Sequence, residues 1–317
     1  MTTAQARDLE VRTHLRPEQV AEVLTLLDAA EEADDTYPLS EHVLLHVRHG
    51  GDADVRHLLL RIDGVLAGYA HVDVTDAVAG SSAELAVHPD YRRRGFGRAL
   101  IERAVAVSPD GRLRLWAHGE LPGAAELAAA LGFTRSRVLW QMRRRIDTAI
   151  PDPVIPDGVR FRDFVPGQDE DAWLTVNRRA FADLPDQASW TRADLEVREA
   201  EPWFDPAGFL LAERIDDGAL LGFHWTKVHG AKGSSAAGGA EGHAHEPIGE
   251  VYVLGVDPAA QGMRLGVALT LAGLGYLRSL GLTNAMLYVD ESNVRGISLY
   301  TGLGFAHWST DVEFARG

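Results

Sequence analysis

The sequence predicts an α/β protein of the α+β kind, with two tandem domains that each hold a mixed, mostly antiparallel sheet flanked by helices. A strand–turn–helix motif occurs at Val87–Gly97 and again at Val256–Gly266. A Leu-Gly-Phe motif follows each copy at nearly the same spacing, at 131–133 and at 303–305. A proline-rich connector separates the two halves. Matched motifs in the same order indicate a duplicated domain.

The first half alternates strand and helix patterns. Residues 17–30 have the apolar periodicity of a helix. Asp63-Gly64 is a strong hairpin signal between two apolar runs, at 57–62 and 65–73. The remaining elements follow the same reading: strand 84–87, helix 96–107, strand 112–116, helix 123–130 and strand 135–143.

The second half repeats this order after the connector. Three prolines, at 151, 153 and 156, stiffen residues 147–158 and end the elements on both sides. We therefore predict an N-terminal domain over 1–146 and a C-terminal domain over 159–317. The glycine-rich stretch 229–247 is predicted to be a loop. The expected elements are strand 159–164, helices 170–181 and 190–199, strands 208–213, 219–228 and 250–256, helix 262–280, strand 285–289 and helix 294–302.

Composition limits the function classes. The formal net charge of −15 over 317 residues argues against a nucleic-acid partner, because an anionic surface repels phosphate. With no cysteine, disulfides, thiolate metal ligands and a cysteine nucleophile are excluded. The histidines lack paired metal-ligand spacing, so no metal is expected. No apolar run predicts a membrane span or a signal peptide. We expect a cytoplasmic monomer with no membrane partner.

The repeated motif has the chemistry of a pyrophosphate site. We call its copy at Val87–Gly97 the first cradle and its copy at Val256–Gly266 the second cradle. A strand that enters a glycine-containing turn and then a helix presents several unpaired N–H groups at the positive end of the helix dipole. Glycine also lets the backbone approach the ligand closely. In the first copy Arg92, Gly95 and Gly97 stand at the key positions. In the second copy these are Gln261, Arg264 and Gly266, so that an arginine replaces the central glycine and a left-handed backbone there is in doubt.

These motifs resemble the Gcn5-related N-acetyltransferase family, whose signature is Gln/Arg-x-x-Gly-x-Gly/Ala. The segments at 201–206, 222–229, 250–258 and 287–293 are further similar to the mycothiol synthases, a tandem group of that family in actinobacteria. The resemblance implies acetyl transfer from acetyl-CoA to the cysteinyl amine of cysteinyl-glucosaminyl-inositol, giving mycothiol and CoA. The small-molecule amine would be bound with acetyl-CoA in a ternary complex, without an acyl-enzyme.

The resemblance also assigns the catalytic groups. Glu250 would be the base that takes the proton of the amine, and Tyr300 the acid that protonates the CoA thiolate. By the offset between the two copies, Ser81 stands opposite Glu250 and Ala128 opposite Tyr300. We therefore expect the second half to be catalytic and the first to bind acetyl-CoA without turnover. Glu84 is interpreted as structural, since it corresponds to Val253.

The same family patterns imply the binding residues. The second cradle would bind acetyl-CoA through Leu254, Gly255, Val256, Gln261, Gly262, Met263, Arg264, Leu265, Gly266, Val267, Asn293, Val294, Arg295, Gly296, Ile297 and Ser298. The amide near Leu254 would serve as an oxyanion donor. A second acetyl-CoA would contact Leu85, Ala86, Val87, Arg93, Arg94, Gly95, Phe96, Gly97 and Arg98. The acceptor would contact Glu41, Asp186, Lys227, Glu250 and Tyr288, although Asp186 stands where the family has a longer carboxylate.

Two alternatives stay open at this point. The protein could acetylate an aminoglycoside or a protein N-terminus, since an acidic surface suits any cationic acceptor. It could instead be an acyl-CoA sensor without activity, although the presence of both Glu250 and Tyr300 argues against that.

Overall fold

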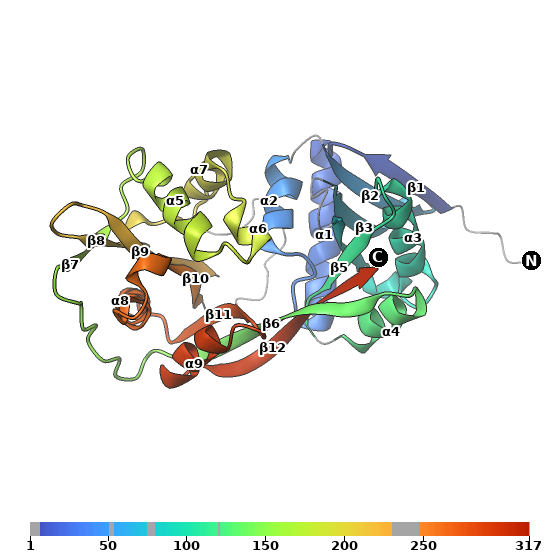
Figure 1. Ribbon diagram of the computed structural model, residues 1–317. Coiled ribbons are helices and arrows are strands. Elements are labelled where there is room, and N and C mark those ends of the chain that lie inside the picture. Colours follow the sequence, from blue (N-terminus) through green and yellow to red (C-terminus); the bar gives the residue numbers. More distant parts are fainter. Residues whose placement is uncertain (1–6, 51–53, 75–79, 120, 230–246, 317) are drawn as a thin grey trace, which may run out of the picture. The chain divides into compact units, whose positions relative to one another are not determined.

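A computed structural model describes residues 7–50, 54–74, 80–119, 121–229 and 247–316 (Figure 1). These residues divide into two compact units that are not contiguous in sequence. Residues 290–292 and 309–317 belong with 1–140, whereas 141–289 and 293–308 form the second unit. The predicted contiguous domains, 1–146 and 159–317, therefore differ from the units at these segments. Most of the predicted loop 229–247 lies outside the described residues.

Two strands that pass from one unit to the other explain why the units are not contiguous in sequence. Strand β6 (Thr134–Arg145) begins in the first unit and ends in the second, next to β11 (Asn284–Asp290). Strand β12 (Ala306–Arg316) begins in the second unit, and its end pairs antiparallel with β5 (Leu113–Ala117) of the first. Each strand thereby covers a sheet edge whose N–H and C=O groups would otherwise be unpaired.

The first unit has the strand order β1-β2-β3-β4-β5-β12. Its strands pair antiparallel except for the parallel pair β4 and β5. Asp63 (φ 50°) and Gly64 (φ 85°) make the predicted hairpin turn. Besides β5, β6 and β12 its elements are β1 (Arg7–Arg12), α1 (Pro17–Asp34), α2 (Glu41–His49), β2 (Val55–Ile62), β3 (Val65–Asp73), β4 (Ser81–Val87), η1 (Pro89–Tyr91), α3 (Phe96–Val107) and α4 (Pro122–Ala130).

The second unit repeats this plan with the order β6-β11-β10-β9-β8-β7. Strands β10 and β11 are again parallel, and β7 to β10 pair antiparallel. Besides β6, β11 and β12 its elements are β7 (Val159–Asp163), α5 (Glu170–Ala180), α6 (Pro185–Ala188), α7 (Arg192–Glu199), η2 (Pro206–Gly208), β8 (Phe209–Arg214), β9 (Leu220–His229), β10 (Ile248–Val256), η3 (Pro258–Ala260), α8 (Leu265–Ser279) and α9 (Val294–Gly302).

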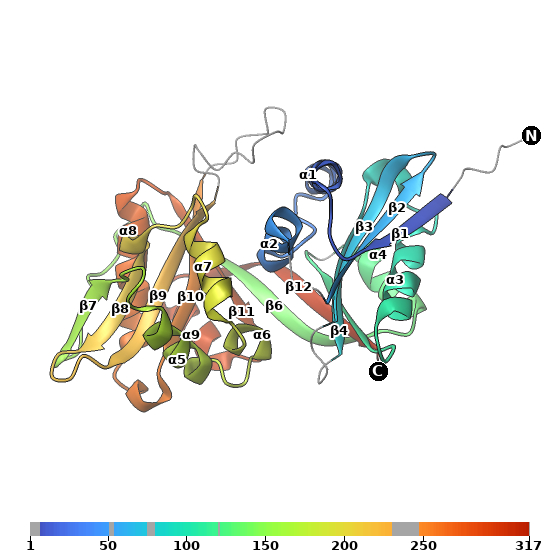
Figure 2. The same cartoon turned by 90° about the horizontal axis from the view of Figure 1, so that it is seen from above.

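The strands of each unit are covered by helices on both faces, as Figure 2 shows for the two units separately. In β2, Leu58 and Leu60 pack with the α3 side chains, whereas Leu59 packs with those of α1. In the second unit Trp173 of α5 packs on one face, and Leu269 of α8 on the other. Strands buried on both faces read as continuous apolar runs, which is why these elements were predictable. The predicted α/β architecture is confirmed.

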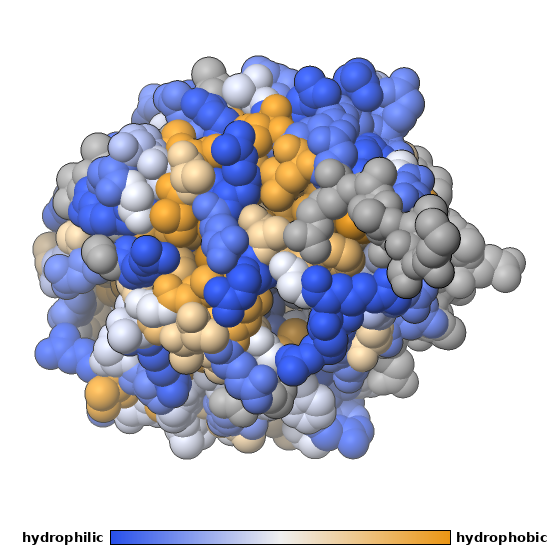
Figure 3. Space-filling model, turned by 90° about the vertical axis from the view of Figure 1, so that its right-hand side faces the viewer, coloured by the Kyte–Doolittle hydropathy of each residue, from blue (hydrophilic) through white to orange (hydrophobic). Residues whose placement is uncertain are grey.

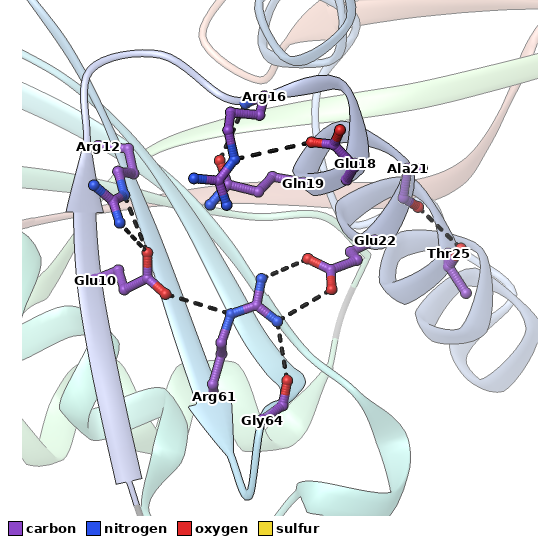
Figure 4. A network of polar contacts seen from close by, with 10 residues as sticks. All are labelled: Glu10, Arg12, Arg16, Glu18, Gln19, Ala21, Glu22, Thr25, Arg61 and Gly64. Carbon is purple, nitrogen blue, oxygen red and sulfur yellow. Dashed lines mark hydrogen bonds and ion pairs between the residues drawn. The ribbon is translucent and has the colours of Figure 1, made fainter.

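Ion pairs link β2 of the first unit to β1 and α1. The Arg61 guanidinium lies 2.5 Å from Glu22 of α1 and 3.5 Å from Glu10 of β1 (Figure 4). Partly exposed ion pairs of this kind contribute about 0–1 kcal/mol each, so they orient elements more than they stabilise them. On the side that carries β1 and α3, apolar residues reach the surface in patches among polar ones (Figure 3).

Candidate active site

Each cradle has two residues with a left-handed backbone, one of them glycine and the other arginine. The order of glycine and arginine is reversed between the two cradles. In the first cradle Arg93 has φ 61° and Gly95 has φ 80°. In the second, Gly262 has φ 90° and Arg264 has φ 60°. The doubt about a left-handed Arg264 was therefore wrong, because the tertiary structure imposes that conformation on arginine. A non-glycine residue in this region costs about 1–2 kcal/mol, and each cradle includes one.

The start of α8 offers free backbone donors. Its first helical bond runs from the Ala268 N–H to the Arg264 carbonyl, so the preceding N–H groups lie outside the helical ladder. No side chain caps this N-terminus. The start of α9, in contrast, is capped by Asn293, whose Oδ1 accepts from the Gly296 N–H at 2.8 Å. An uncapped amide group at a helix start suits an anion such as pyrophosphate.

Strands β10 and β11 stop pairing before they reach the second cradle. Strand β10 pairs with β11 over Gly249–Val251, and among the described residues this pairing goes no further, although β10 continues to Val256 beside β9. Backbone groups of Leu254–Val256 on the β11 side are thus released from the ladder. A bulge between Val251 and Val253 increases the local twist there. An extended pantetheine chain could pair with this edge.

Glycine at the third motif position serves helix packing. A Cβ at Gly97 would lie 3.0 Å from Leu127, and one at Gly266 would lie 3.1 Å from Leu299. The close approach of α3 to α4 is therefore repeated by α8 and α9. An apolar hollow of about 240 Å³ also adjoins the second cradle, lined by Val154, Pro156, Met263, Arg264, Val267, Ala268 and Leu271.

Glu250 lies on β10 before the bulge and is 7% exposed. His229 Nε2 lies 2.7 Å from Glu250 Oε2. Because a carboxylate only accepts hydrogen bonds, the imidazole donates from Nε2. The His229 side chain is 35% exposed, so the pair connects a buried carboxylate with a partly open ring. Sequence reasoning missed His229, although it stands two residues after Lys227 and therefore on the same strand face.

Lys227 is the register partner of Glu250 on β9. It is 8% exposed, so it is not a solvated lysine at a strand end. Its Nζ lies 4.7 Å from the centroid of Trp203 and 5.5 Å from that of Tyr252. Aromatic faces stabilise a desolvated ammonium through their quadrupoles. Glu250 therefore has a cation beside it on β9, and the rings of Trp203 and Tyr252 hold that cation.

Tyr300 lies on α9, the helix that Asn293 caps as predicted. The residue is half-buried, and its ring packs edge-on against Phe305 at 5.9 Å. Burial raises the pKa of the Tyr300 phenol, so the hydroxyl keeps its proton at neutral pH. A phenol in this state carries a proton that a departing thiolate could take.

The remaining predicted acceptor residues are spread over the fold. Tyr288 lies on β11 and is 44% exposed. Asp186 lies in the short helix α6, and its side chain is outside the described part of the structure. Glu41 is the first residue of α2, in the first unit. Of the predicted acceptor set, Lys227, Glu250 and Tyr288 share the second unit's sheet.

Strand registers correct the counterpart of Glu250. Glu250 pairs with Lys227, as Ser82 pairs with Asp73 in the first unit. The bulge adds one residue to β10, so that Ser82, rather than Ser81, occupies the equivalent place. No carboxylate stands there in either reading. For Tyr300 the prediction holds, since Phe305 N–H bonds its carbonyl at 3.0 Å as Phe133 N–H bonds that of Ala128 at 3.0 Å.

The buried carboxylate of the first unit is closed off by its own partners. Glu84 accepts from the Ser40 N–H at 2.5 Å and from the Ser40 hydroxyl at 2.7 Å. His118 bridges Glu84 at 3.3 Å and Asp311 at 3.0 Å. Burial opposes the charge of this ring, but its hydrogen bonds to Asp311 and Glu84 prevail and raise the pKa of His118 to about 10. These contacts support the structural interpretation of Glu84.

The arginine run of the first cradle has divided roles. Arg92 makes a bidentate contact to Asp34 at 2.6 and 2.7 Å and also donates to the Val87 carbonyl. It therefore ties α1 to the first cradle. Arg93 has an 84% exposed side chain, and Arg94 lies over the Tyr91 ring. Arg98 faces Glu102 at 3.7 Å.

Comparisons with known proteins agree with this geometry. Residues 173–305 match the model of the acetyltransferase (GNAT) family, and residues 53–135 match the acetyltransferase (GNAT) domain. A protein called mycothiol acetyltransferase from Acidothermus cellulolyticus is 55% identical over 312 residues, which are 98% of this chain and 94% of the relative. Its namesake from Salinispora arenicola is 56% identical and covers 95% and 94% of the two chains.

Solved structures share the fold. A tandem GNAT protein from the clavulanic acid biosynthesis pathway superposes with a TM-score of 0.74 at 21% identity, covering 98% of both chains. A GCN5-related N-acetyltransferase from Sphaerobacter thermophilus gives a TM-score of 0.67 at 24% identity, covering 97% of this chain and 95% of its own. Among the described residues no helix is both long and apolar enough to cross a membrane. Over the same ranges, no cluster of three or more acidic or histidine side chains could hold a metal ion.

Proposed function

Because this chain belongs to the mycothiol acetyltransferases, and is thus an acetyl-CoA-dependent N-acetyltransferase of mycothiol biosynthesis, we propose that it acetylates the cysteinyl amine of cysteinyl-glucosaminyl-inositol in its second unit. The observation that carries the proposal is the buried Glu250–His229 pair on the strand that enters the uncapped cradle. The first unit has a similar cradle, but Ser82 stands at the position of Glu250.

In the proposed reaction Glu250 takes the proton that the amine must lose, directly or through a water molecule. The amine nitrogen then attacks the acetyl carbonyl carbon, and a C–N bond forms. His229 holds the carboxylate in position by donating to Oε2. Base catalysis of this kind contributes typically about 10²- to 10⁴-fold in rate.

The tetrahedral intermediate needs a donor for its oxyanion and an acid for its leaving group. The backbone N–H near Leu254 lies at the strand edge that β11 leaves open, and supplies the oxyanion contact. As the C–S bond breaks, the sulfur takes the proton of the Tyr300 hydroxyl. Lys227 and Tyr288 contact the acceptor on the same sheet, and Glu41 and Asp186 are further proposed contacts.

Acetyl-CoA is proposed to bind both units and to react in the second. The N–H groups at 261–267 hold the pyrophosphate there, and residues 293–298 border the CoA arm. The first cradle holds a second molecule through residues 85–87 and 93–98. Calorimetry with acetyl-CoA should give two sites per chain, and a single site would contradict this part.

The acceptor is tested directly with a panel of amines. Release of CoA, followed with a thiol reagent, should be fastest with cysteinyl-glucosaminyl-inositol and should require its free cysteinyl amine. An aminoglycoside and a peptide with a free N-terminus serve as the alternative acceptors. Faster turnover of either alternative would overturn the assignment while leaving the acetyltransferase activity intact.

A further inference from the structure

Four side chains of the second unit form a continuous chain on one sheet face. Tyr288 of β11 accepts a hydrogen bond from Gln141 of β6, at 2.8 Å. Gln141 accepts in turn from Arg143 Nε at 2.8 Å. The Arg143 guanidinium lies over the ring of Trp308 of β12, 4.4 Å from its centroid. These contacts require the four side chains to lie on the same side of the sheet.

This face is also the face of the base. Glu250 of β10 is the register partner of Met286 on β11, and paired residues project to the same side. Tyr288 follows Met286 by two residues, so its side chain shares that face. From β10 to β12 the sheet crosses three strand spacings, or about 14 Å. Trp308 therefore lies at the far end of a strip that begins at the proposed base.

The two aromatic rings on this strip are unusually open. Trp308 is 63% exposed and Tyr288 is 44% exposed. In the same unit Trp173 and Trp225 are completely buried in the core. An exposed tryptophan has no packing that orients it, but the guanidinium over one face of Trp308 supplies that order. The other ring face is then presented in a fixed orientation, which lowers the entropy lost on binding.

The chemistry of the strip fits a polyhydroxylated ring. The C–H face of such a ring is apolar and stacks on an aromatic plane, while its hydroxyl groups need fixed donors and acceptors at the edge. Arg143, Gln141 and Tyr288 provide guanidinium, amide and phenol groups beside the open indole.

We propose that Trp308 is the stacking platform for the ring of the acceptor furthest from the reacting amine, and that Arg143 and Gln141 are its positioning residues. The inference rests on the proposed function, because it takes the acceptor to be an amino acid joined to two linked polyol rings. With the amine at Glu250, rings laid along the strip would lead away from the proposed base towards β12.

The test compares two acceptors with the full-length enzyme. One is cysteinyl-glucosaminyl-inositol, and the other is cysteinyl-glucosamine, which lacks the terminal ring. Trp308→Ala should raise KM for the complete acceptor by about tenfold, a typical effect of removing one aromatic contact. It should leave kcat within about twofold and KM for the shorter acceptor unchanged. Trp308→Phe should retain most of the affinity, and Arg143→Met should give a smaller loss of the same selectivity.

Trp116→Ala is the matched control, because Trp116 also lies under an arginine, Arg137, but in the first unit. It should change neither KM, and unchanged acetyl-CoA affinity in each variant reports an intact fold. Equal effects of Trp308→Ala on both acceptors, or none on either, would overturn the platform while sparing the proposed function. If the unmodified enzyme acetylated neither acceptor, the proposed function would fail and the inference with it. A surface used to dock a protein would give the no-effect result.

Discussion

The two units share the same backbone devices but differ in the side chains added to them. Gly97 and Gly266 each let two helices approach, and the cradle start is uncapped in both. Yet Tyr300 stands where the first unit has Ala128. The comparison teaches that a phosphate cradle is a property of the fold, whereas acid–base chemistry depends on a few side chains placed beside it.

The buried carboxylates show the same contrast. Glu84 is enclosed by Ser40 and His118, so each of its oxygens already has a partner. Glu250 has one ring partner, His229, whose side chain is partly open to solvent. A carboxylate with all its partners inside the protein stabilises structure, because moving a proton would break several contacts at once. A carboxylate with capacity left can exchange protons with a substrate.

Replacing the proposed base should give the largest effect. Glu250→Gln should lower kcat by about 10²-fold or more, because the amide cannot take a proton, while acetyl-CoA affinity should be nearly unchanged. Single-turnover kinetics and calorimetry measure the two quantities. Glu84→Gln is the matched change in the first unit and should affect stability, with kcat retained. A Glu250→Gln enzyme with the parental rate and pH profile would remove Glu250 as the base.

Removing the proposed acid should cost less. Tyr300→Phe takes away one oxygen and keeps the ring, so packing against Phe305 persists. Since a thiol has a pKa near 8.5, protonating the thiolate helps less than it would an alkoxide, and we expect a loss of about 10- to 10³-fold in the chemical step. The defect should shrink with an acetyl thioester of a more acidic thiol. An equal loss with both donors, together with weaker acetyl-CoA binding, would make Tyr300 a packing residue.

The bridging imidazolium should make the first unit sensitive to alkali. The pKa of His118 is raised to about 10 in the folded chain, against about 6.5 when unfolded. Its contribution to stability is thus complete below pH 6.5 and is lost as pH rises towards 10. We expect a loss of about 5 kcal/mol over that range, because each pKa unit corresponds to about 1.4 kcal/mol.

Hydrogen exchange of β4 and β5 amides measures this loss within the first unit. His118→Gln should lower stability at pH 6.5 and flatten the pH dependence. The β9 and β10 amides of the second unit provide the internal reference, and should keep their slope in the variant. An unchanged slope in β4 and β5 would show that the imidazolium does not hold the network.

The smallest effect is expected from replacing the left-handed arginine of each cradle, Arg264 or Arg93, by glycine. Arg264→Gly should relieve a left-handed arginine and stabilise the second unit by about 1 kcal/mol, or about 2–4 °C in Tm. Arg93→Gly should do the same for the first unit, since Arg93 has φ 61°. Arg264→Gly should also lower acetyl-CoA affinity, by less than about tenfold, because one cation near the phosphate is lost. This loss of affinity should be smaller at high salt, because salt screens the charge. A fall in Tm for both variants would show that these side chains make stabilising contacts.

Local patterns in the sequence were enough to predict most elements and the duplication, because helix and strand periodicity and turn residues act over a few neighbours. They also placed Glu250 on the strand entering the cradle and Tyr300 on the helix that Asn293 caps. They did not reveal β1, α2 or β12. The solvent-facing residues of these elements interrupt the apolar pattern, and β12 is stabilised by pairing with a strand far away in the sequence.

The tertiary structure decided the rest. The exchange of β6 and β12 depends on which sheet edges remain unpaired, a property that no short segment contains. The left-handed Arg264 is imposed by the strand and helix on either side of it, against the preference of its own side chain. The bulge in β10 shifts the counterpart of Glu250 to Ser82, and the contacts of His118 with Glu84 and Asp311 join residues up to 193 positions apart. Sequence therefore determined where the proposed chemistry could lie, and long-range packing determined that Glu84 is enclosed by its partners whereas the partner of Glu250 is partly open to solvent.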